Sequence, residues 1–389
     1  MPQSVTIFYT QLTITMPKNT PLKNRLFIPL GNTSREQEAN NFDFMRFLGA
    51  CLVIYGHAYP LSGRGTFDHI QLWTRGIFPT AHMGVAIFFV ISGFLISQSI
   101  SRSPSALNFL WKRAVRIFPG LFVAALVTVF VLGAMVTSLP LGEYFTLSET
   151  YRYLLVTKLY PPYPDTLPGV FNTSENHTVN GSLWTLAYEF TCYFALLAVN
   201  LLFPAKFRKQ IILTCFIVTW LSYPFWVEPL SGSSFQIPLF HLRLFNLVDF
   251  GMYFVAGCVA FHYRQYILYK GYLALSFFSF WIGTYLLAES SPSIPLSCVV
   301  WARYLAIPYL VLYLSFIRGH LNGFGRFGDL SYGLYIYAFP IQRIVVSVLG
   351  ATAPIGPIIL LSFLCVLPFA WLSWNFVEKP CLRLKGIVA

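Results

Sequence analysis

The stretch NNFDFMRFLGACLVIYGHAYPL, residues 40–61, is mostly apolar but contains Arg46 and His57. About 20 apolar residues in a helix cross the roughly 30 Å hydrocarbon layer of a membrane. On such a helix Arg46 and His57 fall on one face, roughly 16 Å apart along the axis. A charged group that faces lipid costs at least a few kcal/mol. We therefore expect both side chains to line the same groove inside a helix bundle.

The composition of the whole chain is that of a polytopic membrane protein. Hydrophobic residues make up 56% of the 389 residues, and charged residues only 10%. Soluble domains do not have this balance. The seven cysteines lie singly, without the paired spacing of a disulfide framework or a zinc site, so no metal centre is expected.

Ten apolar stretches are long enough to span the bilayer, which predicts an all-α polytopic membrane protein with about ten transmembrane helices. They lie near residues 43–61, 82–100, 117–138, 183–203, 211–227, 244–262, 271–288, 298–317, 330–349 and 357–376.

The basic residues predict the orientation, because Lys and Arg accumulate in the short loops that stay in the cytoplasm. One alternate set of loops contains most of them, so both termini are expected to be cytoplasmic. Residues 1–40 then form a mobile cytoplasmic tail and residues 386–389 a short cytoplasmic end. This bias, together with anionic lipids, explains the net charge of +12. No nucleic-acid partner is therefore expected, and the oligomeric state stays open.

Two further stretches carry arginines and a buried acid. WKRAVRIFPG, residues 111–120, places Arg113 and Arg116 one helical turn apart, where they could bind phosphates or simply anchor the helix at the cytoplasmic surface. GSLWTLAYEF, residues 181–190, places Glu189 inside a span. An intramembrane carboxylate is functional or paired.

Partners for the buried acids can be named from the other spans. Arg46, Arg303 and Arg343 are the candidate partners of Glu189, and Asp249 is a second buried acid. HMGVAIFFVISGFLIS, residues 82–97, is interrupted by small residues that let helices approach closely. His57 lies too deep to reach the headgroups, but a lone histidine in an apolar span is more often structural than catalytic.

The longest non-cytoplasmic segment, residues 139–182, is rich in proline, aromatic and amide residues in its second half. This composition suits a folded lid over the outer mouth with affinity for sugars. A solvated connector is an equally good interpretation.

These motifs together resemble the membrane-bound acyltransferase 3 family, which O-acylates bacterial surface carbohydrates. The resemblance rests on the R-x10-H pair (Arg46 and His57), the R-x-x-R motif (Arg113 and Arg116) and the W-x-L-x-x-E motif that ends at Glu189. The stretches FFVISGFLI, FGDLSYGLYIYAFP and NFVEKP extend it. It implies one acyltransferase transmembrane domain over residues 41–385, in the bacterial inner membrane.

The resemblance also implies the chemistry. An acetyl or short acyl group would pass from acyl-CoA, typically acetyl-CoA, to a hydroxyl of a surface polysaccharide, a lipopolysaccharide or a lipo-oligosaccharide. His57 would act as general base, since the reference pKa of histidine is about 6.5. Arg46 would stabilise the oxyanion or steer the donor, and Glu189 is grouped with these catalytic residues. Arg113 and Arg116 would bind the CoA phosphates, and no metal takes part.

Two alternatives remain at this point. An acetyl-histidine relay is a second route to the same product. A transporter or flippase for a carbohydrate or lipid-linked sugar also uses intramembrane charged residues, although the two related halves that it would need are not visible.

Overall fold

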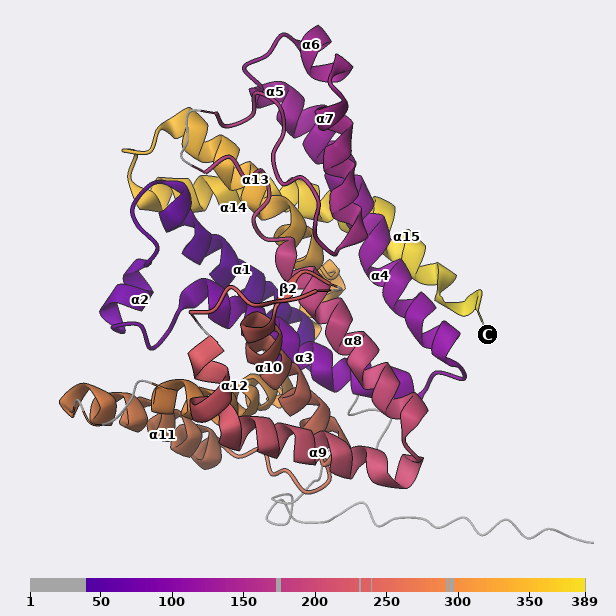
Figure 1. The fold of residues 1–389 in the computed structure, drawn as a ribbon, viewed down its shortest axis with the longest axis vertical. Helices are drawn as coiled ribbons and strands as arrows, with labels where there is room; N and C mark the ends of the chain where they lie inside the picture. Colours follow the sequence, from indigo (N-terminus) through magenta and orange to yellow (C-terminus); the bar gives the residue numbers. More distant parts are fainter. Residues whose placement is uncertain are drawn as a thin grey trace, which may run out of the picture.

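The computed structural model describes residues 40–172, 176–230, 232–238, 240–291, 293 and 297–388. The expected mobile tail lies almost wholly outside the described residues. Within them the regular secondary structure is helical, apart from an isolated bridge and one two-stranded antiparallel sheet in which Gln236 pairs with Arg243 (Figure 1). The all-α class predicted from the sequence is confirmed.

Most elements follow one another with short connections, and the longest connection joins η3 to α8. In chain order they are α1 (Phe42–Leu61), α2 (His69–Trp73), α3 (Thr80–Ser101), α4 (Ala106–Val127), η2 (Thr128–Gly133), α5 (Ala134–Val136), α6 (Leu141–Thr146), α7 (Ser148–Arg152), η3 (Tyr153–Lys158), α8 (Trp184–Leu202), α9 (Ala205–Ser222), η4 (Tyr223–Val227), η5 (Glu228–Leu230), β1 (Gln236–Ile237), β2 (Leu242–Arg243), α10 (Leu244–His262), α11 (Gly271–Ser290), α12 (Ser297–Phe316), η6 (His320–Phe327), α13 (Ser331–Leu349), α14 (Ile355–Leu372), η7 (Ser373–Glu378), α15 (Lys379–Leu382) and η8 (Arg383–Gly386).

Nine helical segments in the described part of the chain are long and apolar enough to cross a membrane, and they match nine of the ten predicted spans. The tenth predicted span, α1, is a helix of 20 residues, but it is not among these nine. It contains Asp43, Arg46 and His57, and it packs against α3, α13 and α14 inside the bundle. Protein rather than lipid therefore surrounds much of the most polar helix.

The segment that was expected to begin near residue 117 begins earlier. A continuous helical run extends over Ala106–Val136. Its start is set by Ser105, whose hydroxyl oxygen accepts a hydrogen bond from the Asn108 amide at 3.1 Å, as an N-cap serine does. The run brings the R-x-x-R motif into a helix that continues through the membrane.

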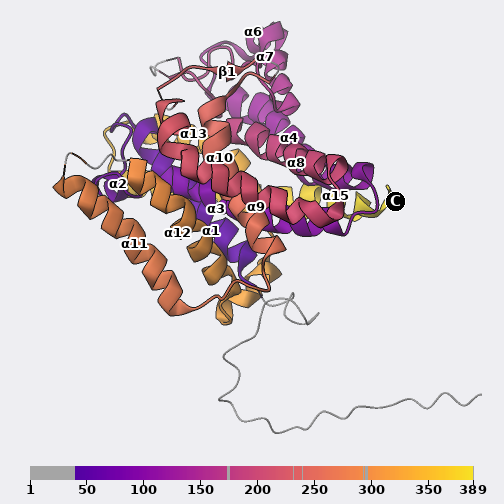
Figure 2. The same cartoon turned by 60° about the horizontal axis from the view of Figure 1, so that its bottom comes forward.

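Helix α3 lies at the centre of the bundle between α1 and α10 (Figures 1 and 2). Gly93 is the point of closest approach to α10: an added Cβ there would lie 2.8 Å from the carbonyl carbon of Phe254. Only glycine fits at such a contact. The expectation that small residues of this span allow close packing is confirmed.

Large apolar side chains remain exposed on the outer helices. Leu275, Leu286 and Leu287 on α11, and Leu360 and Leu364 on α14, are each more than half exposed. Helix α11 lies at the edge of the bundle against α12 (Figure 2). Lipid tails are as apolar as leucine, so these faces are suited to contact the bilayer.

The described residues of the segment between α5 and α8 are folded and contact α13. Thr137 and Val170 form an isolated antiparallel bridge. The Asn180 amide donates to the Ile336 carbonyl oxygen at 2.8 Å, and the Arg343 guanidinium donates to the Asn176 carbonyl oxygen at 2.5 Å. The described part of this segment is thus folded against the bundle, and its role as a cover of the outer mouth stays a prediction.

Candidate active site

Two adjoining cavities between the described helices contain the site residues predicted from the sequence. The first, which we call the arginine cavity, has a volume of about 100 Å³ and is lined by α1, α3, α4, α8 and α13. Its charged side chains are Arg46, Arg113, Arg116 and Glu189. These are four of the five site residues predicted from the sequence, so the fold brings them together.

Two of the three arginines are held by one aspartate. The Arg46 Nη1 atom lies 3.3 Å from both Asp43 Oδ1 and Asp329 Oδ2. Arg116 donates to the same Asp329 oxygen, and its Nη1 lies 3.6 Å from Glu378 Oε2. Asp329 comes from the FGDLSYG stretch, just before α13, and was not singled out in the sequence.

The electrostatics of Asp329 follow from these contacts. Burial alone would raise the pKa of its carboxyl group, but Arg116 and Arg46 outweigh burial and lower the pKa to about 2. The carboxylate is therefore charged at any physiological pH. It neutralises part of the positive charge that Arg46 and Arg116 bring to the cavity.

Arg113 differs from its neighbours. It appears in none of the ion pairs between described residues. Its Nη2 atom donates to the Ser99 hydroxyl at 3.3 Å, and its buried Nε has no hydrogen-bond partner within the described part of the chain. Arg113 is thus the arginine of this cavity best able to take an anionic ligand, because an anion would satisfy donors that are left over.

Glu189 is held by hydroxyl groups. Its carboxylate accepts hydrogen bonds from Tyr193, at 2.5 Å, and from Ser92. The prediction that Arg46, Arg303 or Arg343 pairs with Glu189 is wrong for the described residues, because each of the three contacts other groups. Ser92, which the sequence suggested as a packing residue, is thus a hydrogen-bond donor to this carboxylate.

The second cavity, the histidine cavity, has a volume of about 330 Å³, and His57, His82, Asp249 and Arg303 are among the residues that line it. Arg46 does not line it, and His57 does not line the arginine cavity. The expectation that Arg46 and His57 share one groove is therefore wrong. Their separation along α1 places them in two different compartments.

The His57 ring lies edge-on to Phe339, with ring centroids 5.3 Å apart. Its nitrogen atoms form no hydrogen bond to a side chain or carbonyl group in the described part of the chain. The imidazole is therefore not held in place by hydrogen bonds, and both of its nitrogen atoms remain available to a substrate.

The other histidine of this cavity is part of a network. His82 Nε2 lies 2.5 Å from Asp249 Oδ2, and the Asp249 carboxylate also accepts a hydrogen bond from Tyr304. Arg303 Nη2 lies 3.5 Å from Asp249 Oδ1. Asp249 thus has the partners that the sequence could not name. His82 opens the stretch HMGVAIFF, and its polar ring in an apolar span was the signal that could have revealed it.

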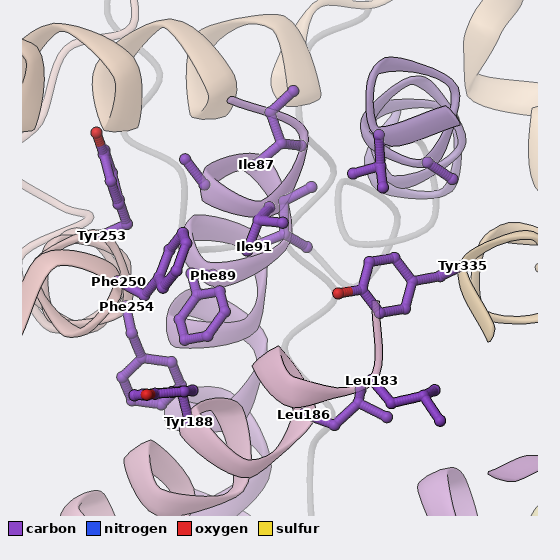
Figure 3. Packing of buried hydrophobic residues seen from close by; sticks show 14 of the residues in the cluster. Ile87, Phe89, Ile91, Leu183, Leu186, Tyr188, Phe250, Tyr253, Phe254 and Tyr335 are labelled. Atoms are coloured by element: carbon purple, nitrogen blue, oxygen red, sulfur yellow. The ribbon is translucent and has the colours of Figure 1, made fainter. Parts of the chain in front are cut away.

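The two cavities share a wall. Val85, Thr185 and Tyr335 line both of them. The Thr185 and Tyr335 hydroxyls are hydrogen bonded to each other, and Tyr335 also donates to the Ser182 carbonyl oxygen at 2.7 Å. Figure 3 shows the Tyr335 hydroxyl pointing toward the start of α8, beside Leu183 and Leu186. Three side chains thus separate an arginine-rich compartment from a histidine-rich one.

A membrane-embedded helix bundle with two polar cavities is typical of an intramembrane enzyme or a transporter. A comparison with known families decides between these classes: the acyltransferase-domain family model matches residues 40–374. The chain therefore belongs to the membrane-bound acyltransferase 3 family, as its motifs predicted, and it is an acyltransferase by family.

Two curated proteins are similar over almost the whole chain. The O-acetyl transferase of Shigella phage Sf6 is 31% identical over 345 residues, which cover 89% of this chain and 96% of the relative. Nodulation protein 10 of Rhizobium leguminosarum bv. viciae is 29% identical over 392 residues, covering 89% of this chain and 94% of the relative. No solved structure matches the chain.

Proposed function

We propose that this protein transfers an acetyl or short acyl group from acyl-CoA to a hydroxyl of a bacterial surface carbohydrate. One observation carries the proposal: a cavity with unpaired cationic donors and a cavity with imidazoles meet at a wall of only three residues. The phosphates of the acyl donor need cationic groups, and the weakly acidic hydroxyl of the acceptor needs a base. The two cavities would supply these groups on either side of the place where the acyl group is transferred.

The donor belongs to the arginine cavity in this proposal. Arg113 and Arg116, with Arg46 beside them, attract the CoA phosphates, and Arg113 has free donors for them. The positive-inside bias favours a cytoplasmic mouth for this cavity and cytoplasmic termini in the inner membrane. The long pantetheine arm of CoA would reach the shared wall, where the thioester would meet its acceptor.

The acceptor belongs to the histidine cavity. A sugar hydroxyl is a poor nucleophile and needs a base, and histidine has a reference pKa close to the operating pH. His57 is the base selected by the R-x10-H motif. The oxyanion that forms on the thioester carbonyl needs hydrogen-bond donors. The Thr185 and Tyr335 hydroxyls line both cavities, and they would serve as these donors by turning from their present partners, each other and the Ser182 carbonyl oxygen. Glu189, one turn beyond Thr185 on α8, keeps the charge balance beside the arginines.

The names of the relatives support the class of group that is moved. One relative is called an O-acetyl transferase, which favours acetyl-CoA as the donor. Possible acceptors in this proposal are a polysaccharide, a lipopolysaccharide or a lipo-oligosaccharide.

The test uses the full-length protein in lipid nanodiscs with acetyl-CoA radiolabelled in the acetyl group. Membrane carbohydrate from the source cells serves as the acceptor pool. We expect label in the carbohydrate with wild-type protein, and none with a His57→Ala variant that binds acetyl-CoA and melts like wild type. The proposal fails if wild-type protein leaves the carbohydrate unlabelled. The role of His57 fails if the variant labels it at the normal rate.

A further inference from the structure

His57 and His82 are neighbours across the contact of two helices. Gly56 of α1 lies directly against Ala81 of α3, because a Cβ added at Gly56 would lie 2.8 Å from the Ala81 amide nitrogen. Each histidine is the next residue along its helix, and both line the histidine cavity. The close approach of the two backbones thus supplies the cavity with two imidazoles rather than one.

The surroundings of the two rings differ. His57 contacts the apolar ring of Phe339. His82 is stacked on Phe250, with centroids 4.9 Å apart, and its Nε2 lies 2.5 Å from the Asp249 carboxylate. A side chain that is stacked on one face and hydrogen bonded at one end has a fixed orientation, so His82 is preorganised in a way that His57 is not.

We propose that His82 is a second catalytic residue and that its Nδ1 atom accepts the proton of the acceptor hydroxyl. This inference rests on the proposed function and refines it: His82 becomes the base, and His57 contacts the acceptor beside it. An ionised carboxylate only accepts hydrogen bonds. Nε2 must therefore carry the hydrogen that points to Asp249, and in the neutral ring Nδ1 is left as the acceptor.

The hydrogen-bonding state of the His82 ring agrees with its role as a base. The Nδ1 atom of His82 is shielded from solvent and has no hydrogen-bond partner among the described residues. A buried polar atom without a partner is uncommon and costs free energy. A substrate hydroxyl that donates to Nδ1 would satisfy it, and the Asp249 carboxylate would stabilise the imidazolium that results.

The chemical step balances with these groups. The hydroxyl oxygen forms a bond to the thioester carbonyl carbon while its proton moves to His82 Nδ1. The tetrahedral intermediate then breaks its carbon–sulfur bond, and the thiolate of CoA takes the proton back from His82. The products are an ester and free CoA, and His82 returns to its neutral form.

The pH dependence of this step depends on the groups around His82. Those that face it from the packed elements are Asp249 and Tyr253 of α10, Arg303 and Tyr304 of α12, His57 of α1, Tyr223 of η4 and Tyr335 of α13. Arg303 opposes the effect of Asp249, because it is a cation bound to the same carboxylate. The test therefore uses an added base of known pKa instead of the protein's own groups.

The experiment measures acetyl transfer by His82→Ala in nanodiscs, with and without added imidazoles that fit the space of the missing ring. General bases contribute typically 10²–10⁴-fold, so we expect kcat to fall at least about a hundredfold while KM for acetyl-CoA changes little. Added imidazole should restore part of kcat. With imidazoles of different pKa, the acid limb of the pH profile should move with the pKa of the added base. Asp249→Asn should also lower kcat, because an amide can donate to Nε2 and force the hydrogen onto Nδ1.

His262→Ala is the matched control, since His262 lies at the end of α10 and lines neither cavity. It should transfer at the wild-type rate and gain nothing from imidazole. If the wild type is active and the His82→Ala variant has a normal kcat, the proposed role of His82 is wrong. The proposed function is not affected by this result. A folded variant that is inactive and not rescued also overturns it, because that result indicates a structural role. A wild type without transfer overturns both.

Discussion

Asp329→Asn removes the anion that Arg46 and Arg116 share, and its cost can be worked from the structure. The Asp329 side chain is 11% exposed, and its pKa is lowered from 3.8 to about 2 against the opposing effect of burial. A pKa lowered to this extent corresponds to a free energy on the order of 2 kcal/mol in favour of the folded state. We expect the free energy of unfolding of the variant to fall by about this amount. The loss is smaller if Asp43 and Glu378 bind the same arginines more closely.

The pH dependence has a definite sign. A carboxyl group whose pKa is lowered by folding stabilises the protein fully above its unfolded pKa, and this contribution is lost only as pH falls toward the lower, folded value. The difference between wild type and Asp329→Asn should therefore be the same at pH 5.5 and pH 8. Thermal unfolding in detergent, followed by intrinsic fluorescence, should show a lower melting temperature, on the order of 5 °C.

Asp43→Asn is the control for this prediction. The Asp43 side chain is 41% exposed, and Arg46 is its ion-pair partner among the described residues. Solvent screens such a pair, so its loss should cost well under 1 kcal/mol. Equal melting temperatures for wild type and Asp329→Asn, or a larger loss in Asp43→Asn, would refute the view that Asp329 is the anchor of the two arginines.

The remaining predictions concern the two cavities and the cover. Arg113→Gln should raise KM for acyl-CoA about tenfold, because one charge-assisted contact is lost, and should leave the melting temperature unchanged. Arg116→Gln should instead reduce the yield of folded protein, because Asp329 loses its closest cation. Identical effects of the two variants in both assays would contradict these different roles of the two arginines. Val85→Trp should place a larger side chain between the two cavities and abolish transfer, while acyl-CoA still binds in a filter assay. Val85→Ala should retain transfer. Arg343→Ala should speed limited proteolysis within residues 160–180, because it removes the hydrogen bond to Asn176; unchanged cleavage would contradict docking through this arginine.

The sequence singled out polar side chains that line the two cavities, but it assigned their contacts less well. Its spacing placed Arg46 and His57 on one face of α1, but that face passes through two cavities. It named Glu189 and Asp249 as buried acids and chose the wrong partners for Glu189. Helical periodicity gives the direction of a side chain on its own helix, whereas a partner from another helix depends on how the helices cross.

The sequence by itself determined that this is a membrane protein, and it determined its helical class, nine of its spans and its family. These follow from hydrophobicity and the length of a helix needed to cross the bilayer, which are local properties of the chain. The tertiary structure decided which residues meet: Asp329 with two arginines from α1 and α4, and His82 with Asp249 of α10. Such pairings are long-range, because they form only when the close contacts at Gly56 and Gly93 fix how α1, α3 and α10 pack.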